Sequence, residues 1–255
     1  MPLEIVTIPC LSDNYAFLAH DPTTGTTAVV DVPEAAPILA ALEARGWNAD
    51  LVLLTHHHWD HVEGLEGIKA KFPAKVVGAR ADAERLPPLD IALDEGDSVA
   101  IGNEVGRVID VSGHTVGHIA YHFPESRAVF TADSLMALGC GRVFEGTMPM
   151  MWDSLCKLAK LPPETTVYSG HEYTEANARF AVTVDPDNPE LARRIDDIRQ
   201  KRAQGVPTVP SLLSEELVTN PFLRAADAGI RAHLGMQGAI DADVFAEIRG
   251  RKDRF

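Results

Sequence analysis

Four histidines and an aspartate fall within six positions of the sequence, which reads His-His-His-Trp-Asp-His at residues 56–61. In an extended backbone His56, His58 and Asp60 project to one side, whereas His61 is shifted by one position and faces another point. One short loop can therefore supply ligands to two neighbouring metal ions. His57 is out of phase with its neighbours, and we interpret it as structural. A solvated histidine-rich loop and a buried hydrogen-bonded cluster are the alternatives for the whole run.

Three more ligand-type residues follow segments that read as strands: His114 in Ser-Gly-His-Thr, Asp133 in Phe-Thr-Ala-Asp, and His171 in Ser-Gly-His-Glu. Loops at the ends of rigid strands fix ligand geometry without burying unpaired groups. With the histidine-rich run this gives seven nitrogen and oxygen ligands, too many for one tetrahedral ion and about right for two. Such donors suit zinc, iron or manganese rather than calcium. We interpret His118 as an outer partner of a ligating imidazole.

The segments before residue 173 alternate between strands and helices. Apolar, β-branched runs bounded by turn residues predict strands, and apolar residues at helical spacing predict helices. The predicted strands are Leu3–Pro9, Tyr15–His20, Thr26–Val32, Asp50–Thr55, Lys75–Ala79, Ser98–Ile101, Val105–Val111, Ile119–Phe123, Ala128–Thr131 and Thr166–Ser169. The predicted helices are Glu34–Arg45, Val62–Phe72 and Met150–Leu161. This pattern predicts an α+β protein, a β-rich sandwich with helices outside.

The pattern becomes helical from Thr174 onward. Helices or helical turns are predicted at Ala176–Val182, Pro189–Gln204, Ser214–Leu217, Ala225–Leu234 and Ala242–Arg249. We therefore expect a metal-binding domain over residues 1–172 and a helical C-terminal region over residues 173–255.

The composition restricts the function classes. A formal net charge of −14 opposes binding to nucleic acid or anionic lipid, which needs clustered Lys and Arg. The three cysteines form no Cys-x-x-Cys pair, so neither a disulfide framework nor a thiolate zinc site is indicated. No apolar stretch approaches the roughly 18 residues that span a bilayer, and no signal-peptide pattern opens the chain. We expect a cytoplasmic monomer with neither nucleic-acid nor membrane partners.

The ligand order resembles the metallo-β-lactamase superfamily, in which His-x-His-x-Asp-His is followed by a histidine, an aspartate and a histidine. Within it, the chain is similar over essentially its full length to glyoxalase II, the hydroxyacylglutathione hydrolase family. The motifs that carry this similarity are Asn14-Tyr15, Gly139-Cys140-Gly141-Arg142, His171-Glu172-Tyr173-Thr174, Asn220-Pro221-Phe222-Leu223-Arg224 and Arg249-x-x-Lys252-Asp253. The resemblance implies an αββα sandwich of the metallo-β-lactamase type, with a helical C-terminal region and one or two metals at the strand ends.

The resemblance also implies roles for individual residues. The first metal would be held by His56, His58 and His114, the second by Asp60, His61 and His171, and Asp133 would bridge them. Glutathione would be bound by Arg142, Tyr173, Arg249 and Lys252. Phe144 stands where the family often has tyrosine, so a phenol hydrogen bond to glutathione is missing. Trp59, Glu63 and Ala132 also depart from the family pattern without removing a ligand.

The expected reaction is hydrolysis of the thioester S-(2-hydroxyacyl)glutathione, S-D-lactoylglutathione in particular, to D-lactate and glutathione in methylglyoxal detoxification. Two divalent ions, zinc first with iron or manganese as alternatives, would share a hydroxide that Asp60 orients. Four of the chain's 23 basic residues lie in its last seven positions and could grip the glycyl carboxylate of glutathione. A solvated helix end is the other interpretation of that cluster.

Two other functions are compatible with the sequence. One is a persulfide dioxygenase with a single iron on the same scaffold, against which the long tail with Asn-Pro-Phe-Leu-Arg argues. The other is a non-catalytic metal-binding or nucleic-acid-processing protein, against which the complete ligand set and the acidic charge argue. Nucleophilic catalysis by Cys140 or Cys156 is disfavoured, because the sequence shows no catalytic dyad.

Overall fold

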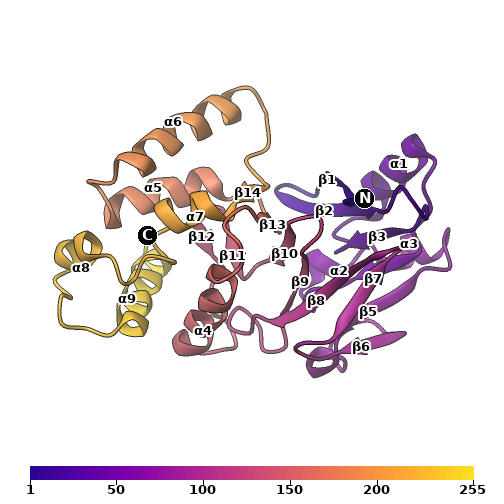
Figure 1. Cartoon of the computed structure of the whole chain (residues 1–255), viewed down its shortest axis with the longest axis horizontal. Helices are drawn as coiled ribbons and strands as arrows, with labels where there is room; N and C mark the ends of the chain where they lie inside the picture. Colours follow the sequence, from indigo (N-terminus) through magenta and orange to yellow (C-terminus); the bar gives the residue numbers. More distant parts are fainter. The chain divides into compact units, whose positions relative to one another are not determined.

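The computed structural model describes residues 1–255, and the chain consists of two compact units (Figure 1). Unit 1 comprises Met1–Asp110 and Val116–Thr131, and unit 2 comprises Val111–Thr115 and Ala132–Phe255. The functional division expected at residues 172 and 173 stays a prediction.

A mixed six-stranded sheet begins unit 1, with the strands in sequence order. They are β1 (Glu4–Cys10), β2 (Asn14–His20), β3 (Thr27–Val30), β4 (Leu51–Leu53), β5 (Lys75–Ala79) and β6 (Ile91–Leu93). The strands β1 to β3 pair antiparallel, and β3 to β6 pair parallel. Parallel strands are covered on both faces, which is why β3 and β4 read as continuous apolar runs.

Helices cover one face of this sheet. They are α1 (Ala35–Arg45), α2 (Trp59–Val62) and α3 (Leu65–Lys69), with the 3₁₀ turn η1 (Arg80–Asp82) after β5. Ile38 and Leu42 of α1 and Ile68 of α3 pack with Leu18 and Val52 of the sheet in one core. Helix α1 ends at Gly46, whose φ of 66° is the left-handed conformation that glycine adopts without strain.

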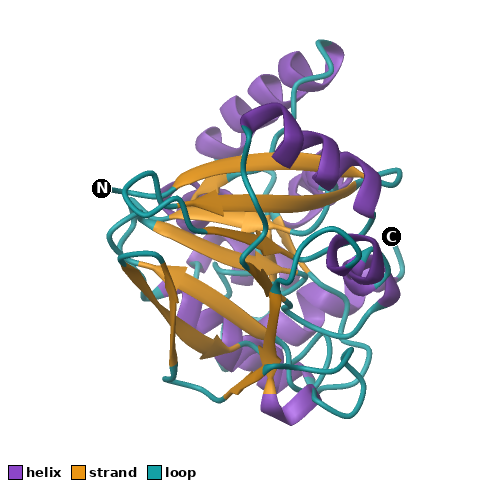
Figure 2. Ribbon diagram, turned by 90° about the vertical axis from the view of Figure 1, so that its right-hand side faces the viewer, coloured by secondary structure: helices purple, strands orange, loops and turns teal.

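A second, antiparallel sheet in unit 1 contains β7 (Ser98–Ile101), β8 (Glu104–Asp110), β9 (Ile119–Phe123) and β10 (Ala128–Ala132). Its inner face packs on the first sheet (Figure 2): the Phe17 and Phe130 ring centroids lie 5.6 Å apart, and the Tyr121 hydroxyl donates to the Leu54 carbonyl at 2.8 Å. The unit is therefore a two-sheet sandwich with helices on one side.

Unit 2 is mainly helical. Its helices are α4 (Met148–Ala159), α5 (Thr174–Val184), α6 (Pro189–Ala203), α7 (Leu213–Thr219), α8 (Ala228–Leu234) and α9 (Asp241–Asp253). Its short strands are β11 (Leu135–Met136), β12 (Gly139–Cys140), β13 (Thr166–Ser169) and β14 (Ser211–Leu212), with β11 paired to β12 and β13 to β14. Leu138 packs with Ala178 and Ala181 of α5 and with Leu191 and Ile195 of α6.

The predicted strands and the helical C-terminal region are confirmed, with three kinds of difference. The strands β6, β11, β12 and β14 were not predicted, because two or three residues show no periodicity. Of the helix predicted at Val62–Phe72, only Leu65–Lys69 forms one continuous helix, α3, and the chain turns before it where the Gly64 amide donates to the Val32 carbonyl at 2.8 Å. Helix α2 lies earlier, at Trp59–Val62, so the extended backbone expected for the histidine-rich run is wrong at Asp60 and His61, which are helical. Helix α8 begins at Ala228 rather than Ala225, since the Asp227 side chain caps it. No helix is long and apolar enough to cross a membrane.

Candidate metal centre

The histidine-rich run lies at the carboxyl edge of the parallel part of the first sheet. Parallel strands end at the same edge, so the residues that follow β3, β4 and β5 meet there. The Asp31 amide donates to Leu53 O at 3.0 Å, and the Leu54 amide donates to Val77 O at 2.8 Å. The sheet thereby brings Asp31, the run from His56 to His61, and Asp82 together.

Asp31 fixes the orientation of the run. Its carboxylate accepts from the Thr55 amide at 2.9 Å, from the Thr55 hydroxyl at 2.8 Å, and from His61 Nδ1 at 2.8 Å. A carboxylate offers no proton here, so His61 donates from Nδ1 and keeps Nε2 as its ligand atom. The Thr55 proton is committed to Asp31, so His56 Nδ1 donates to Thr55 Oγ1 at 3.0 Å and Nε2 is again the ligand atom.

The ligand atoms of the run have the spacing that a metal requires. Two ligands bound at about 2.05 Å to one tetrahedral ion lie about 3.3 Å apart. His56 Nε2 and His58 Nδ1 are separated by 3.1 Å, which fits a shared ion. His61 Nε2 lies 4.0 Å from Asp60 Oδ2. The His56 and His61 ring centroids are 4.3 Å apart, which places this second pair of donors beside the first.

The neighbours of these ligands are well defined. Asn14 Nδ2 donates to Asp60 Oδ2 at 3.1 Å and to the Asp60 carbonyl at 3.0 Å. His57 turns instead to Asp82, with Nδ1 2.9 Å from Oδ2, in keeping with a structural role. The buried His118 ring stacks on His56 with centroids 4.5 Å apart. Asp31 and Asn14 were not predicted; for Asp31 the available signal was one acidic residue inside the apolar stretch Ala28–Val32.

Unit 2 contains the other three predicted ligands, His114, Asp133 and His171, all of them buried. Asp133 Oδ2 lies 3.4 Å from His114 Nε2 and 3.3 Å from His171 Nε2. Both distances match the separation of two ligands on one ion, and the shared carboxylate stands between the two imidazoles. This group therefore suits a bridging carboxylate with a histidine on either side.

Each of these three residues is held by its backbone surroundings. Gly170, which precedes His171, donates from its amide to the Ala132 carbonyl at 3.0 Å, which ties the end of β13 to the residue before Asp133. His114 Nδ1 donates to the Arg142 carbonyl at 2.7 Å, which leaves Nε2 as its ligand atom. A Cβ at Gly113 would lie 2.8 Å from the backbone of Met151 on α4, so only glycine lets this loop approach the helix.

Two family models match the chain: the metallo-beta-lactamase superfamily over residues 21–171 and the hydroxyacylglutathione hydrolase C-terminus over residues 172–255. A hydroxyacylglutathione hydrolase of Ruegeria pomeroyi is 66% identical over 255 residues, which cover 100% of both chains. The chain belongs to the hydroxyacylglutathione hydrolase family.

A more distant relative agrees with this family, and a solved structure agrees with the fold. A hydroxyacylglutathione hydrolase of Mesorhizobium japonicum is 52% identical over 100% of both chains. The crystal structure of ETHE1 from Myxococcus xanthus covers 98% of this chain and 90% of its own, with a TM-score of 0.67 at 24% identity, and shows the fold. The predicted family, the fold class of the metallo-β-lactamase type and the activity of a metal-dependent thioester hydrolase are confirmed. The dioxygenase alternative is not favoured.

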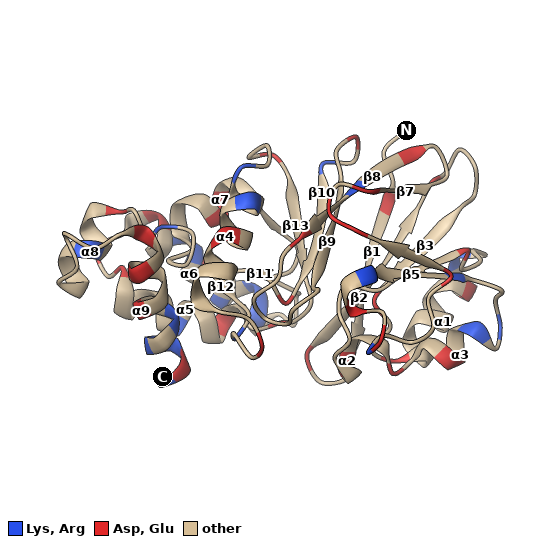
Figure 3. Cartoon of the chain, turned by 90° about the horizontal axis from the view of Figure 1, so that it is seen from below, with Lys and Arg blue, Asp and Glu red and all other residues tan.

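The four side chains that the hydroxyacylglutathione hydrolase family would use to bind glutathione all lie in unit 2. The Tyr173 ring stacks on His171, with centroids 4.6 Å apart. Arg142 is largely exposed, and its Nε lies 3.5 Å from Asp253 Oδ1. Arg249 is buried and donates to the Cys140 carbonyl at 2.8 Å and to Asp253 at 3.1 Å. Figure 3 shows basic segments at the C-terminal end of α9.

Lys252 has an unusual environment for a surface lysine. Its Nζ donates to the Ala176 carbonyl at 3.2 Å and lies 5.2 and 5.3 Å from the ring centroids of Phe180 and Phe255. Burial, and then the nearby cations Arg249 and Arg179, lower the pKa of Lys252 to about 8. An anion bound beside Lys252 would favour its charged form.

The cysteines do not have the environment of a nucleophile. Burial raises the pKa of the Cys10 thiol and of the Cys140 thiol to about 11. Burial also raises the pKa of Cys156. Thiols with raised pKa values carry little thiolate near neutral pH, so the disfavoured cysteine mechanism gains no support.

Proposed function

We propose that this chain hydrolyses S-(2-hydroxyacyl)glutathione, with S-D-lactoylglutathione as the main substrate and D-lactate and glutathione as products, in the detoxification of methylglyoxal. The observation that carries the proposal is the spacing of the donors. In unit 1 the nitrogens of His56 and His58 lie 3.1 Å apart, and in unit 2 the Asp133 carboxylate lies 3.3 to 3.4 Å from two imidazole nitrogens, as ligands of a common ion would. The Asp60 and His61 donors are wider apart, at 4.0 Å. Relatives named hydroxyacylglutathione hydrolase at 52 to 66% identity support the substrate class.

We assign the seven donors to two divalent ions. His56, His58 and His114 would hold the first ion, and Asp60, His61 and His171 the second, with Asp133 between them. Zinc is the first choice, and iron or manganese accept the same ligands. When bound, such a pair lowers the pKa of a shared water and polarises a carbonyl oxygen.

The protein's own groups then set the geometry of the attack. Asp60 would accept a hydrogen bond from the attacking hydroxide and so orient its lone pair toward the thioester carbonyl. Asn14 restrains Asp60 for this task, since it donates to the carboxylate and to the carbonyl of the same residue. The glutathione thiolate is a good leaving group, so the reaction needs no general acid from the chain.

Recognition of glutathione is assigned to Arg142, Tyr173, Arg249 and Lys252. Glutathione carries carboxylates, and charge-assisted hydrogen bonds to ammonium and guanidinium groups are strong. The lowered pKa of Lys252 is consistent with this assignment, because burial first, and then the cations Arg249 and Arg179, disfavour an ammonium that a bound anion would stabilise. Residues 173–255 would thus complete the substrate site of a metal-binding domain formed by residues 1–172, in a cytoplasmic, monomeric enzyme.

One assay tests the proposal. Thiol release from S-D-lactoylglutathione is measured on protein whose zinc, iron and manganese contents have been quantified. We expect rapid hydrolysis at about two ions per chain, loss of activity after chelation, and recovery on adding zinc. One iron per chain, with oxygen consumption on glutathione persulfide and no thiol release from the thioester, would overturn the proposal in favour of the dioxygenase.

A further inference from the structure

The hairpin formed by β11 and β12, residues 135–140, joins two parts of the candidate site. Asp133 lies two positions before it, and Arg142 lies two positions after it. Its ladder is short, with only Leu135 paired to Cys140 and Met136 to Gly139. A ladder of this length leaves backbone groups of the turn without strand partners, and buried backbone groups need partners. Side chains from the helices of unit 2 therefore have to supply them.

Helix α7 and the residue after it supply most of these partners. Glu216 Oε2 accepts from the Leu138 amide at 2.9 Å. Asn220 Nδ2 donates to the Met136 carbonyl at 3.1 Å and to the Gly139 carbonyl at 3.0 Å. Glu216 and Asn220 are fully buried and contact each other at 3.0 Å. Two side chains, both remote in sequence, thus hold three backbone groups of the hairpin.

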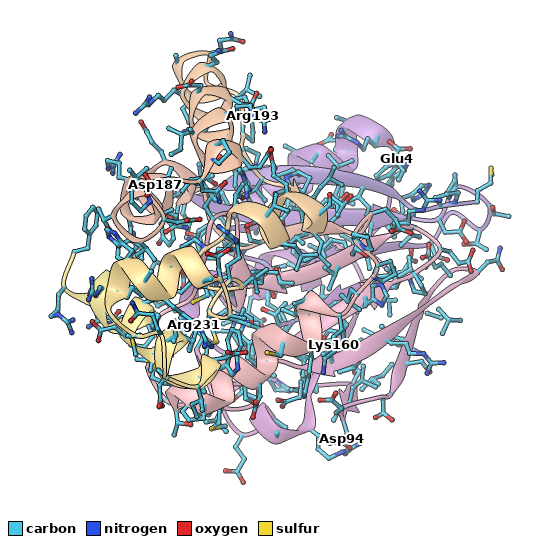
Figure 4. All side chains as sticks on the ribbon, turned by 60° about the vertical axis from the view of Figure 1, so that its left-hand side comes forward. Glu4, Asp94, Lys160, Asp187, Arg193 and Arg231 are labelled. Atoms are coloured by element: carbon cyan, nitrogen blue, oxygen red, sulfur yellow. The ribbon has the colours of Figure 1, made fainter.

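The charge of Glu216 is balanced by Arg194 of α6, which donates to Glu216 Oε1 and, at 2.6 Å, to Thr219. The Arg194 side chain is 4% exposed, whereas that of its neighbour Arg193, labelled in Figure 4, is 70% exposed. A buried ion pair gains little net stability over apolar residues of similar volume, because desolvation opposes the attraction. The Arg194–Glu216 ion pair is better explained by the hairpin, because the Leu138 amide needs an acceptor held in a fixed place, and Glu216 is that acceptor.

The position of the hairpin determines the positions of two proposed metal ligands, Asp133 and His114. The Gly141 amide donates to the Ser134 carbonyl at 3.1 Å, and a Cβ at Gly141 would overlap the Asp133 carbonyl. At the other end, the Arg142 carbonyl accepts the hydrogen bond that orients His114. A shift of the hairpin would therefore move Asp133 and release the His114 ring.

We propose that Glu216 and Asn220, with Arg194 as the counter-charge, are positioning residues that fix the β11–β12 hairpin and, through it, the metal ligands Asp133 and His114. The inference rests on the proposed function only in taking those two residues as ligands. Partners outside the ligand shell commonly change metal affinity or activity by about 10- to 100-fold when removed.

The test compares Glu216→Ala and Asn220→Ala with Asp185→Ala. Asp185 is a matched control, because it is a buried acid of the same helical region that accepts from Arg224 and Asn188 and does not contact the hairpin. Asn220→Ala keeps the Arg194–Glu216 pair, so it serves if Glu216→Ala does not fold. Three quantities are measured for each holoenzyme: the melting temperature, the metal retained against a competing chelator, and the d–d absorption spectrum after loading with cobalt(II).

We expect all three variants to melt lower. The two hairpin variants should also hold metal about 10-fold or more weakly, show an altered cobalt spectrum and lose turnover by a similar factor. Asp185→Ala should keep wild-type values of metal affinity, spectrum and kcat. If the hairpin variants lose only thermal stability, with metal affinity and spectrum like the control, the positioning role is wrong. A wild-type protein that binds metal and releases no thiol would refute the proposed function instead.

Discussion

Asn14 and Asp60 are joined by two hydrogen bonds, one from Asn14 Nδ2 to the Asp60 carboxylate at 3.1 Å and one to the Asp60 carbonyl at 3.0 Å. The bond to the carbonyl fixes the backbone of Asp60, and the bond to the carboxylate fixes its side chain. Asn14 is buried, so water would not replace it without rearrangement. The pair determines where the Asp60 carboxylate lies relative to His61.

Replacing Asn14 with alanine should therefore disturb Asp60 without removing a ligand. We expect kcat for S-D-lactoylglutathione to fall about 10- to 100-fold, with a smaller change in KM, because no substrate contact is lost. Initial rates over a range of substrate concentrations separate the two parameters. Ser12→Ala, at an exposed position in the turn just before β2, is the control and should behave as wild type. A kcat unchanged in Asn14→Ala would show that Asp60 needs no such restraint.

Removal of a ligand should have a larger effect. His58→Ala and Asp133→Ala should each abolish detectable turnover and lower the metal content measured by elemental analysis, because each takes a donor from the first coordination sphere. His233→Ala is the control, because it removes an imidazole that is hydrogen-bonded to the Thr183 carbonyl of α5. It should change neither the turnover nor the metal content. Full activity in both ligand variants would disprove the metal assignment.

The seven donors could be predicted from the sequence because metal ligands leave a local signal, namely histidine and aspartate at set spacings after apolar runs. The residues that orient them leave a weaker signal: the motifs with Asn14 and Asn220 indicate a family but no role, and Asp31 is one acidic residue in an apolar stretch. Asn14 and Asp60 are 46 positions apart, and Asp31 meets His61 across 30 positions. Asn220 reaches the β11–β12 hairpin across 84 positions. The tertiary fold brings such partners together, and a short window of sequence does not include both members of the pair.

The same reason explains the errors in the secondary structure. Apolar spacing alone predicts one helix over 62–72, whereas the structure has α3 over Leu65–Lys69, with Leu65 and Ile68 buried, and the separate α2 before it at Trp59–Val62. The break at Gly64 comes from the close approach of another backbone segment, where a Cβ would lie 2.7 Å from the Ala35 amide nitrogen and 2.9 Å from the Val32 carbonyl oxygen. Periodicity carries no information about that contact.

The Gly64 contact gives a prediction about stability. Gly64→Ala should lower the free energy of unfolding by about 1 to 3 kcal/mol, because backbone atoms of Val32, Glu34 and Ala35, between β3 and the start of α1, must shift to admit the methyl group. Urea unfolding followed by circular dichroism measures the change. Gly238→Ala is the matched control, since a Cβ there meets no atom within 4 Å and its free energy should change by less than about 0.5 kcal/mol. Equal effects of the two substitutions would contradict the close-packing explanation.

Lys252 is expected to contribute to binding rather than to turnover. Lys252→Met keeps an apolar chain against Phe180 and Phe255 and removes the charge together with the hydrogen bond to the Ala176 carbonyl. We expect KM for S-D-lactoylglutathione to rise about 10-fold or more, from loss of a charge-assisted hydrogen bond, while KM for a small neutral thioester stays constant. Arg251→Met on the same helix breaks only the exposed pair with Glu247 and is the control. Equal changes for both substrates in Lys252→Met would make the lysine structural.

The pKa of Lys252 predicts how substrate binding depends on pH. Burial and the cations Arg249 and Arg179 lower that pKa to about 8, so the free enzyme carries the ammonium below pH 8 and loses it above. The substrate carboxylates are ionised throughout this range. KM for S-D-lactoylglutathione should therefore be flat from pH 6 to 7.5 and rise above about pH 8, toward the value of Lys252→Met. Lys252→Arg, whose guanidinium stays protonated, should remove the rise. A KM profile that is identical in wild type and Lys252→Met would show that another group controls the pH dependence.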